Sequence, residues 1–326
     1  MSDYTAPLAQ ITAALHLHGG ITGLAQLEPF AEATPDLVQS VLDEAGRLAA
    51  QVLAPLNRAG DLDGARLDNG IVRTTPGWSG AWAALVEGGW NGVSAPVEYG
   101  GMGLPQVLNL AVQEMWHSAN MAFALCPMLT LGAANAIQTN GSDDQKYRFL
   151  PHLTSGAWTG TMNLTEPMAG SDLAAISTRA TPDGEGYLIR GQKIFITYGD
   201  HDMADNIVHL VLARLPDAPP GVRGISLFIV PKVLADGTAN DLRCISLEHK
   251  LGIHGSPTAV LAFGEAGGAR GELVGQPHRG LEYMFAMMNH ARLNVGLQGL
   301  AIAERAYQQA LSYARERRQG QPIGDR

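Results

Sequence analysis

Arg292 is the residue whose chemistry stands out first, because it is the only Arg, Lys, Asp or Glu between Tyr283 and Ala303. A single charge on an apolar helix is costly to bury unless another group pairs with it. The ordinary interpretation is therefore a structural ion pair with a carboxylate from another element. Asn289 is three residues earlier and faces the same side of a helix, so both side chains can serve one site.

Two short polar motifs and one apolar run carry the other candidate groups. Thr165-Glu166-Pro167 and Gly170-Ser171-Asp172 are, taken alone, ordinary turn sequences. The run 194–197 is, taken alone, a buried strand with one aromatic residue, Phe195. None of these patterns identifies a reaction by itself.

Several familiar catalytic patterns are absent from the sequence. His16 and His18 have no Cys or carboxylate partner at metal-ligand spacing. No Gly-x-Ser-x-Gly motif marks a hydrolase nucleophile. The glycines at 100, 101 and 103 do not follow a predicted strand, so they are not a dinucleotide-binding fingerprint.

Composition narrows the class of protein. The chain has 326 residues, 46% of them hydrophobic and 16% charged, which is typical of a well-buried globular protein. A net charge of −9 disfavours nucleic acid as the main partner. The two cysteines, Cys126 and Cys244, are far apart, which argues against a disulfide framework and favours a reducing compartment.

Targeting signals are not visible either. The first residues show no basic start followed by an apolar run, so no signal peptide is predicted. The apolar stretch 283–303 contains too many polar residues to span a membrane. We therefore expect a cytoplasmic protein with no membrane span.

The hydrophobic pattern divides the chain into three zones. Residues up to about 155 predict helices, with starts at Thr34-Pro35-Asp36 and Thr75-Pro76 and a capping box at Ser142 and Gln145. Residues 157 to about 275 contain short β-branched runs, and from Gly280 to about Gln319 the pattern predicts one long helix. The expected strands are 187–189, 194–197, 207–212, 225–230 and 259–263.

These zones predict an α+β multidomain protein with an N-terminal helical domain, a middle antiparallel β-barrel or sandwich domain, and the start of a C-terminal helical bundle. The long helix is apolar around much of its girth and needs a cover. The N-terminal helices, another subunit or chain beyond Arg326 could provide it, and we expect a continuation. The expected boundaries are an extension at 1–35, the helical domain at 36–156, the β-domain at 157–277 and the incomplete helical segment at 278–326.

Two linked motifs resemble the flavin-binding signature of the acyl-CoA dehydrogenase family. They are TMNLTEPMAGSD at 161–172 and KIFITYG at 193–199. VEYGGMGLP at 97–105 resembles the family's helical-domain loop, and residues 287–318 resemble the first long helix of its C-terminal domain. The resemblance covers about residues 36–326. The extension before residue 36 and the sequence at 248–264 resemble a branch of this family with larger subunits. That branch includes the 3-(methylthio)propionyl-CoA dehydrogenases.

The resemblance implies an FAD-dependent oxidoreductase of fatty acid metabolism. Such an enzyme converts an acyl-CoA to the trans-2-enoyl-CoA: a carboxylate removes the α-proton as hydride leaves the β-carbon for the flavin. Electron-transfer flavoprotein is the implied acceptor. FAD lies between subunits in this family, so a homo-oligomer is also implied.

The resemblance assigns cofactor contacts residue by residue. Phe195 takes the place of the family's usual Trp beside the isoalloxazine ring, which keeps an apolar ring and removes an indole donor. Arg317 matches an Arg that reaches the FAD of a neighbouring subunit, and a cation at a helix C-terminus is the alternative interpretation. The implied cofactor-binding residues are Met162, Leu164, Thr165, Ser171, Phe195, Ile196, Thr197 and Arg317.

On the substrate side, the resemblance places Arg292 beside the thioester and Ser171 and Asn289 along the CoA chain. Some relatives carry the catalytic Glu immediately before this Arg, where this sequence has Ala291. No residue of the chain is therefore nominated as the catalytic base, which is expected beyond Arg326. Glu166 is expected to belong to the turn.

Two other functions stay open. One is a catalytically inert flavin- or CoA-binding fragment, or an assembly partner, because the sequence offers no base. The other is a relative that passes its electrons to oxygen. Bleaching of the flavin by acyl-CoA under anaerobic conditions separates the first from an enzyme, and the peroxide yield identifies the second.

Overall fold

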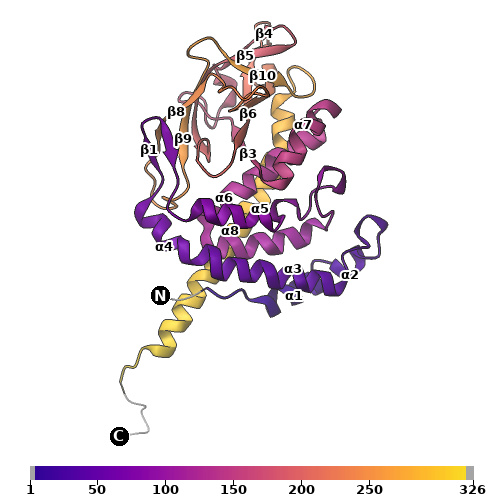
Figure 1. Ribbon diagram of the computed structural model, residues 1–326, viewed down its shortest axis with the longest axis vertical. Coiled ribbons are helices and arrows are strands. Elements are labelled where there is room, and N and C mark those ends of the chain that lie inside the picture. Colours follow the sequence, from indigo (N-terminus) through magenta and orange to yellow (C-terminus); the bar gives the residue numbers. More distant parts are fainter. Residues whose placement is uncertain (1–3, 321–326) are drawn as a thin grey trace.

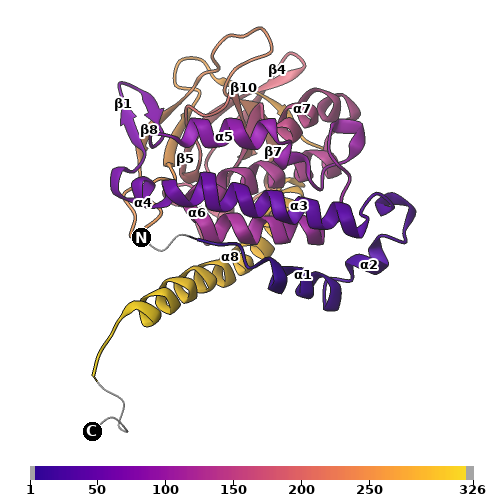
Figure 2. The same ribbon diagram turned by 60° about the horizontal axis from the view of Figure 1, so that its bottom comes forward.

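A β-domain lies against a layer of helices, and one long helix runs along both (Figure 1). The computed structural model describes residues 4–320. Residues 321–326, the end of the segment expected at 278–326, lie outside this range. Helix α8 (Gly280–Glu316) begins beside the β-domain, packs on the central helix α6 (Gln106–Asn140) and then extends beyond the other helices (Figure 2). The predicted arrangement of helices, β-domain and C-terminal helix is confirmed.

Local capping signals fix two helices where the sequence predicts them. Helix α3 (Pro35–Leu48) begins after Thr34, whose hydroxyl accepts a hydrogen bond from the Leu37 N–H at 3.3 Å. Helix α7 (Asp143–Ser155) begins with the predicted capping box of Ser142 and Gln145 and stops at Gly156, which adopts φ 82°. Both predicted starts are confirmed.

The predicted helix start at Thr75-Pro76 is wrong. Helix α5 (Trp78–Glu87) begins later, because Gly77 adopts φ 90° and interrupts the helical geometry. The Trp78 N–H instead closes a turn on the Thr75 carbonyl at 3.1 Å. The expectation of helices alone before residue 155 also needs correction, since β1 (Arg66–Asp68) and β2 (Ile71–Arg73) form a hairpin.

The N-terminal extension is an ordered part of the helical layer. It contains α1 (Leu8–Leu17) and α2 (Ile21–Leu24), and its residues Tyr4, Ile11 and Leu15 are buried in the main core. The Thr5 backbone exchanges two hydrogen bonds with the Gln308 side chain of α8, at 3.1 and 2.7 Å. The extension therefore holds α8 against the helical layer.

Helix α6 is kinked at Asn120, which has φ −156° and ψ 87°. The Asn120 side-chain oxygen accepts a hydrogen bond from the Phe123 N–H at 3.1 Å, so it caps the second part of the helix. Carbonyls freed before the kink, those of Ser118 and Ala119, accept hydrogen bonds from Arg305 of α8 at 3.1 and 2.7 Å. The kink thus creates a docking point for α8.

Helix α6 is also the described helix that is long and apolar enough to cross a membrane. Most of its apolar window is buried inside the protein, and the core helix of a globular protein passes the same test.

Short helical turns connect this layer: η1 (Glu28–Phe30), η2 (Ala49–Leu53), η3 (Trp90–Gly92) and η4 (Val97–Tyr99), with α4 (Ala54–Asp63) after η2.

The β-domain is a barrel-like sheet with the strand order β10-β7-β6-β4-β5-β9-β8. It closes because β10 pairs with both β7 and β5. The barrel prediction is confirmed, but the sheet is not purely antiparallel: β3 and β4 both pair parallel to β6. Parallel pairing is possible because residues 164–205 form a long connection between β3 and β6. The strands are β3 (Trp158–Asn163), β4 (Arg179–Asp183), β5 (Gly186–Thr197), β6 (Asn206–Arg214), β7 (Ile225–Pro231), β8 (Leu242–Leu247), β9 (Thr258–Phe263) and β10 (Ala269–Leu273).

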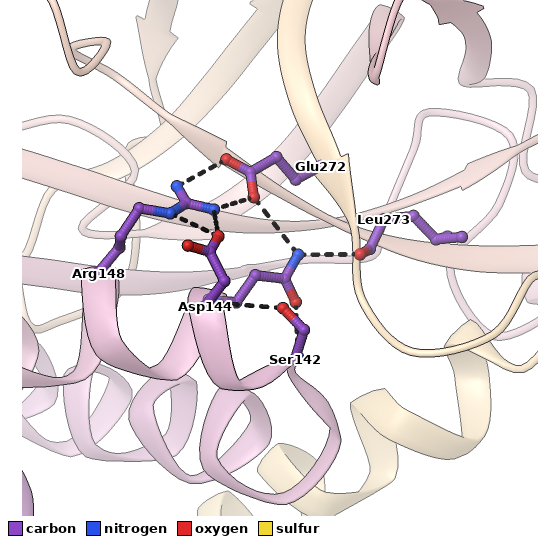
Figure 3. Close-up of polar contacts among 6 residues, drawn as sticks. Ser142, Asp144, Arg148, Glu272 and Leu273 are labelled. Carbon is purple, nitrogen blue, oxygen red and sulfur yellow. Dashed lines mark hydrogen bonds and ion pairs between the residues drawn. The ribbon is translucent and has the colours of Figure 1, made fainter.

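A polar contact joins the helical layer to the barrel (Figure 3). Arg148 of α7 donates to both carboxylate oxygens of Glu272 in β10, at 2.9 and 2.6 Å, and also to Asp144 at 2.8 Å. Gln145 adds a hydrogen bond to the Leu273 carbonyl at 3.0 Å. The start of α7 is therefore fixed against the end of β10.

Replacing Glu272 by Gln tests the strength of this contact. We expect the free energy of unfolding to fall by about 0.5–1 kcal/mol, because both partners of the ion pair are partly exposed to solvent. Urea denaturation at low and high salt measures the change. A loss that is equally large in 1 M salt would contradict an electrostatic origin.

Candidate active site

The two sequence motifs meet in space. The Ile194 N–H of β5 donates a hydrogen bond to the Thr165 carbonyl at 2.9 Å, across the segment that follows β3. The Lys193 ammonium donates to the neighbouring Leu164 carbonyl at 3.0 Å. The residues around Thr165 and those around Phe195 therefore form one continuous site on the barrel wall.

Strand β3 positions the first motif between the barrel and α6. Gly160 lies so close to α6 that an added Cβ would overlap the Cβ of Ala133. Met162 and Leu164 follow on the same face of the strand and pack partly against the main core. Among the described strands β3 pairs only with β6, and α6 covers it: the Gly160 N–H donates to the Thr130 hydroxyl of α6 at 3.2 Å.

Phe195 lies at an irregularity of β5. The register between β5 and β9 shifts between Lys193 and Ile196, and Phe195 has φ 61°, a left-handed conformation that is strained for an aromatic residue. Its side chain is 57% exposed, whereas Ile196 beside it is buried. The interpretation of Phe195 as a buried strand aromatic is therefore wrong. Strain of this kind is typical of functional sites.

Two hydroxyl groups of the site are free. Thr165 and Thr197 are half-buried, and neither hydroxyl makes a hydrogen bond to a residue within 4–320. The Thr197 backbone pairs with Thr258 of β9, which fixes its position. Both hydroxyls can therefore donate to a bound ligand. Ser171 lies further along the same loop and is exposed.

Glu166 lies in the turn that links these groups, where its N–H pairs with the Ala169 carbonyl at 2.9 Å. Its carboxylate points inward and forms a buried ion pair with Lys193 at 2.9 Å. Burial alone would raise the pKa of Glu166, but the Lys193 charge and hydrogen bonds from Thr178, Lys193 and Ser177 outweigh it and lower the pKa to about 2. Burial also lowers the pKa of Lys193, to about 8. Both groups are therefore ionised at neutral pH.

This low pKa predicts a loss of stability in acid. The folded-state pKa of Glu166 lies below its ordinary value of 4.5, so its contribution is complete above pH 4.5 and disappears as the pH falls towards 2. A shift of this size corresponds to about 3 kcal/mol. Urea unfolding of the unaltered chain and of Glu166→Gln between pH 2.5 and 7 measures it. Stability curves that run parallel over this range would contradict the prediction.

The candidate substrate residues lie on α8. Arg292 is exposed, donates to the Asn289 side-chain oxygen at 3.3 Å and lies over the Phe285 ring at 5.3 Å. No carboxylate of the described residues forms an ion pair with Arg292, so the structural ion-pair interpretation has no support in this part of the chain. The guanidinium is free to bind an external group.

Arg317 lies apart from the other candidates. It follows the last residue of α8, is exposed, and its Nε donates to the Tyr313 hydroxyl at 3.1 Å. At 1.5 Å per residue it is about 37 Å along the helix from Arg292. Within the described chain, Arg317 therefore does not join the site on the barrel. The flavin-motif residues around β3 and β5 do come together.

Comparison with known proteins identifies the class of protein. Sequence profiles of the acyl-CoA dehydrogenase N-terminal, middle and C-terminal domains match residues 36–157, 161–266 and 278–326. The chain therefore belongs to the acyl-CoA dehydrogenase family, whose members depend on FAD. The predicted family membership is confirmed.

Individual relatives extend this comparison. The chain is 51% identical to 3-methylmercaptopropionyl-CoA dehydrogenase of Ruegeria pomeroyi, over 98% of this chain and 55% of that protein. A solved structure described as an electron transferring flavoprotein of Acidaminococcus fermentans is 30% identical, with TM-score 0.74, over 90% of this chain and 72% of that chain. The acyl-CoA dehydrogenase of Bacillus anthracis complexed with FAD is 25% identical, with TM-score 0.72, over 91% of this chain and 47% of that chain.

The chain spans about half the length of the curated relatives it matches, 55% of the first and 50% of the second. The residues present fit the flavin on which the family depends. The hydroxyls of Thr165 and Thr197 are free, and the exposed Phe195 ring offers an apolar surface. The neighbouring charged side chains of Glu166 and Lys193 are buried and bind each other.

Proposed function

We propose that the chain forms the FAD-binding and thioester-binding parts of an enzyme that dehydrogenates an acyl-CoA to the trans-2-enoyl-CoA. The observation that carries this proposal is the hydrogen bond between Ile194 and Thr165, which joins the two flavin motifs into one site. Family membership supports it. When bound, FAD supplies the hydride acceptor that no amino-acid side chain can provide.

The residues of the chain have separate tasks in this proposal. Thr165 and Thr197 donate hydrogen bonds to the polar edge of the flavin, where charge develops during reduction. Met162, Leu164 and Phe195 supply an apolar surface for the ring and exclude water from it. Arg292 and Asn289 orient the thioester and the CoA chain. Arg317, at the distant end of α8, would reach the FAD of another subunit in a homo-oligomer.

The substrate is proposed from the relative in Ruegeria pomeroyi, which is named for 3-methylmercaptopropionyl-CoA. A short thioether or straight-chain acyl-CoA is therefore the first candidate. Electron-transfer flavoprotein is the proposed acceptor, the cytoplasm the proposed compartment, and fatty acid metabolism the proposed context. The reduced cysteines Cys126 and Cys244 are compatible with that compartment.

A second candidate function is an inert flavin-binding unit. Position 291, which precedes Arg292, is an alanine and cannot act as the base. Large apolar side chains of α8, among them Leu293, Val295 and Leu300, are exposed in the described chain. Both observations favour a unit that needs further structure to complete its active site.

Two measurements on the purified chain separate these functions. Titration with FAD, followed by flavin absorbance and fluorescence, should show saturable binding. Anaerobic addition of 3-methylmercaptopropionyl-CoA or butyryl-CoA should then bleach the oxidised flavin band if the unit is active. Binding without bleaching supports the inert unit, and bleaching followed by peroxide release in air supports an oxidase. A chain that binds no FAD would overturn the proposal.

A further inference from the structure

A buried ion pair lies directly beneath the proposed flavin surface. Glu166 belongs to the turn after β3, and Lys193 belongs to β5 just before its irregularity. Their side chains are 3% and 0% exposed, and the Lys193 Nζ lies 2.9 Å from the Glu166 Oε1. Neither side chain reaches solvent, whereas Phe195 is exposed. The pair is therefore placed to act on the site from behind rather than to touch a ligand.

Every part of this pair is tied to the surrounding backbone. The Glu166 Oε2 accepts hydrogen bonds from the N–H and hydroxyl of Ser177, both at 2.7 Å. Its Oε1 accepts the N–H and hydroxyl of Thr178 at 3.1 and 2.5 Å, in addition to the Lys193 ammonium. Lys193 also donates to the Leu164 carbonyl at 3.0 Å. Three separate chain segments are thus connected through one carboxylate and one ammonium group.

A buried ion pair is weak evidence for stability, because desolvation of the two charges offsets much of their attraction. Such a pair instead fixes the positions of the segments that carry it, because separating the two groups leaves an uncompensated charge in the core. Here the geometry that it fixes is that of the site. The pair sets the distance between the Leu164 carbonyl and β5, and the adjacent Ile194–Thr165 hydrogen bond depends on that distance.

The pair also explains how a strained residue persists. Phe195 keeps φ 61° although an aromatic residue disfavours the left-handed region. Such strain survives only where the neighbouring structure determines the backbone on both sides. Lys193 is anchored before Phe195, and the backbone of Ile196 and Thr197 pairs with β9 after it.

We infer that Glu166 and Lys193 are positioning residues for the flavin contacts of the chain. They hold the Thr165 turn against β5, so that the hydroxyls of Thr165 and Thr197 and the Phe195 ring present one surface. The inference rests on the proposed function. It adds that an ion pair which touches neither cofactor nor substrate determines how tightly and in which orientation the flavin binds.

Three variants test this inference in the full chain: Lys193→Met, the neutral double variant Glu166→Gln with Lys193→Met, and Glu272→Gln as the control. The control breaks the ion pair between Glu272 and Arg148 (Figure 3), and neither of these residues belongs to the two motifs. The measurements are the FAD dissociation constant, the visible circular dichroism of bound flavin, the thermal midpoint, and amide hydrogen exchange of residues 164–178 without FAD.

Lys193→Met should weaken FAD binding at least tenfold and speed amide exchange within 164–178. The double variant should recover thermal stability, because no unpaired charge is left, yet keep FAD binding at least tenfold weakened with an altered flavin spectrum. Glu272→Gln should leave the FAD dissociation constant within twofold. A merely structural ion pair predicts instead that FAD binding returns together with the thermal midpoint.

The inference is overturned if the double variant binds FAD like the unaltered chain with an unchanged spectrum, or if exchange in 164–178 is unaffected by Lys193→Met. It is equally overturned if FAD binding follows the thermal midpoint in all variants, including Glu272→Gln. Failure of the proposed function looks different, because the unaltered chain then binds no FAD while the exchange measurement still reports on the turn.

Discussion

A chain carrying both Thr165→Val and Thr197→Val is expected to bind FAD about 30- to 100-fold more weakly than the unaltered chain. Valine keeps the shape of threonine and removes the hydroxyl. Each lost hydrogen bond to the flavin costs about 1–1.5 kcal/mol, and every 1.4 kcal/mol changes the dissociation constant tenfold. Because neither hydroxyl has a partner in the described protein, its removal should change the affinity without disturbing the fold.

Thr181→Val is the matched control for this experiment. Thr181 lies on β4 and is exposed, outside both flavin motifs. Titration of FAD against each protein, followed by quenching of flavin fluorescence, gives the dissociation constants. Affinity that is unchanged in the double variant, or reduced equally by Thr181→Val, would show that the two hydroxyls do not bind the cofactor.

A large loss of stability is expected from Gly280→Ala at the beginning of α8. A Cβ at this position would overlap the backbone of Ser226 and Leu227, and backbone atoms cannot turn away as a side chain can. The helix must move off the barrel, and we expect the free energy of unfolding to fall by about 3 kcal/mol. Urea denaturation followed by tryptophan fluorescence measures this change.

Gly299→Ala in the middle of the same helix separates this clash from the helix propensity of alanine. No atom lies within 4 Å of a Cβ placed on Gly299. Alanine is favoured over glycine inside a helix by about 0.5–1 kcal/mol, so this variant should be as stable as the unaltered chain or slightly more stable. Equal destabilisation by the two substitutions would falsify the proposed contact between α8 and β7.

Local signals in the sequence predicted those parts of the fold that local chemistry decides. Thr34 and Ser142 cap helices because their hydroxyls bond to N–H groups only three residues away. The start at Thr75-Pro76 was wrong because the left-handed Gly77 dominates over the proline that precedes it. The hairpin at 66–73 was missed although Asn69-Gly70, with φ 49° and 81°, is a strong hairpin signal.

The sheet was harder to predict. Strand β10, with the sequence Ala-Arg-Gly-Glu-Leu, has little β-branched character, and it forms because pairing with β5 and β7 closes the barrel. Strand β3 was also missed, and its parallel pairing with β6 joins residues far apart in the chain. Long-range pairing of this kind leaves no local pattern.

The site shows the same division. The sequence resemblance nominated Thr165, Phe195 and Thr197 for the site. The structure joins the Thr165 segment to β5, the strand that carries Phe195 and Thr197. Lys193 was missed, although a lysine next to Ile194 in an apolar strand is an available signal for a buried charge. Its partner Glu166 could be interpreted only as a turn residue, because the inward direction of the carboxylate depends on tertiary contacts.

The contact between Thr5 and Gln308 also constrains how the molecule is assembled. Residue 5 leaves the ribosome long before residue 308, so the extension must wait, unattached at this point, until most of α8 has been synthesised. Closing a loop of this length is slow, because its entropy must be lost before the contact forms. The Thr5–Gln308 contact can therefore form only after most of α8 has been synthesised, whereas α1 can already pack on α3 and α6 before that point.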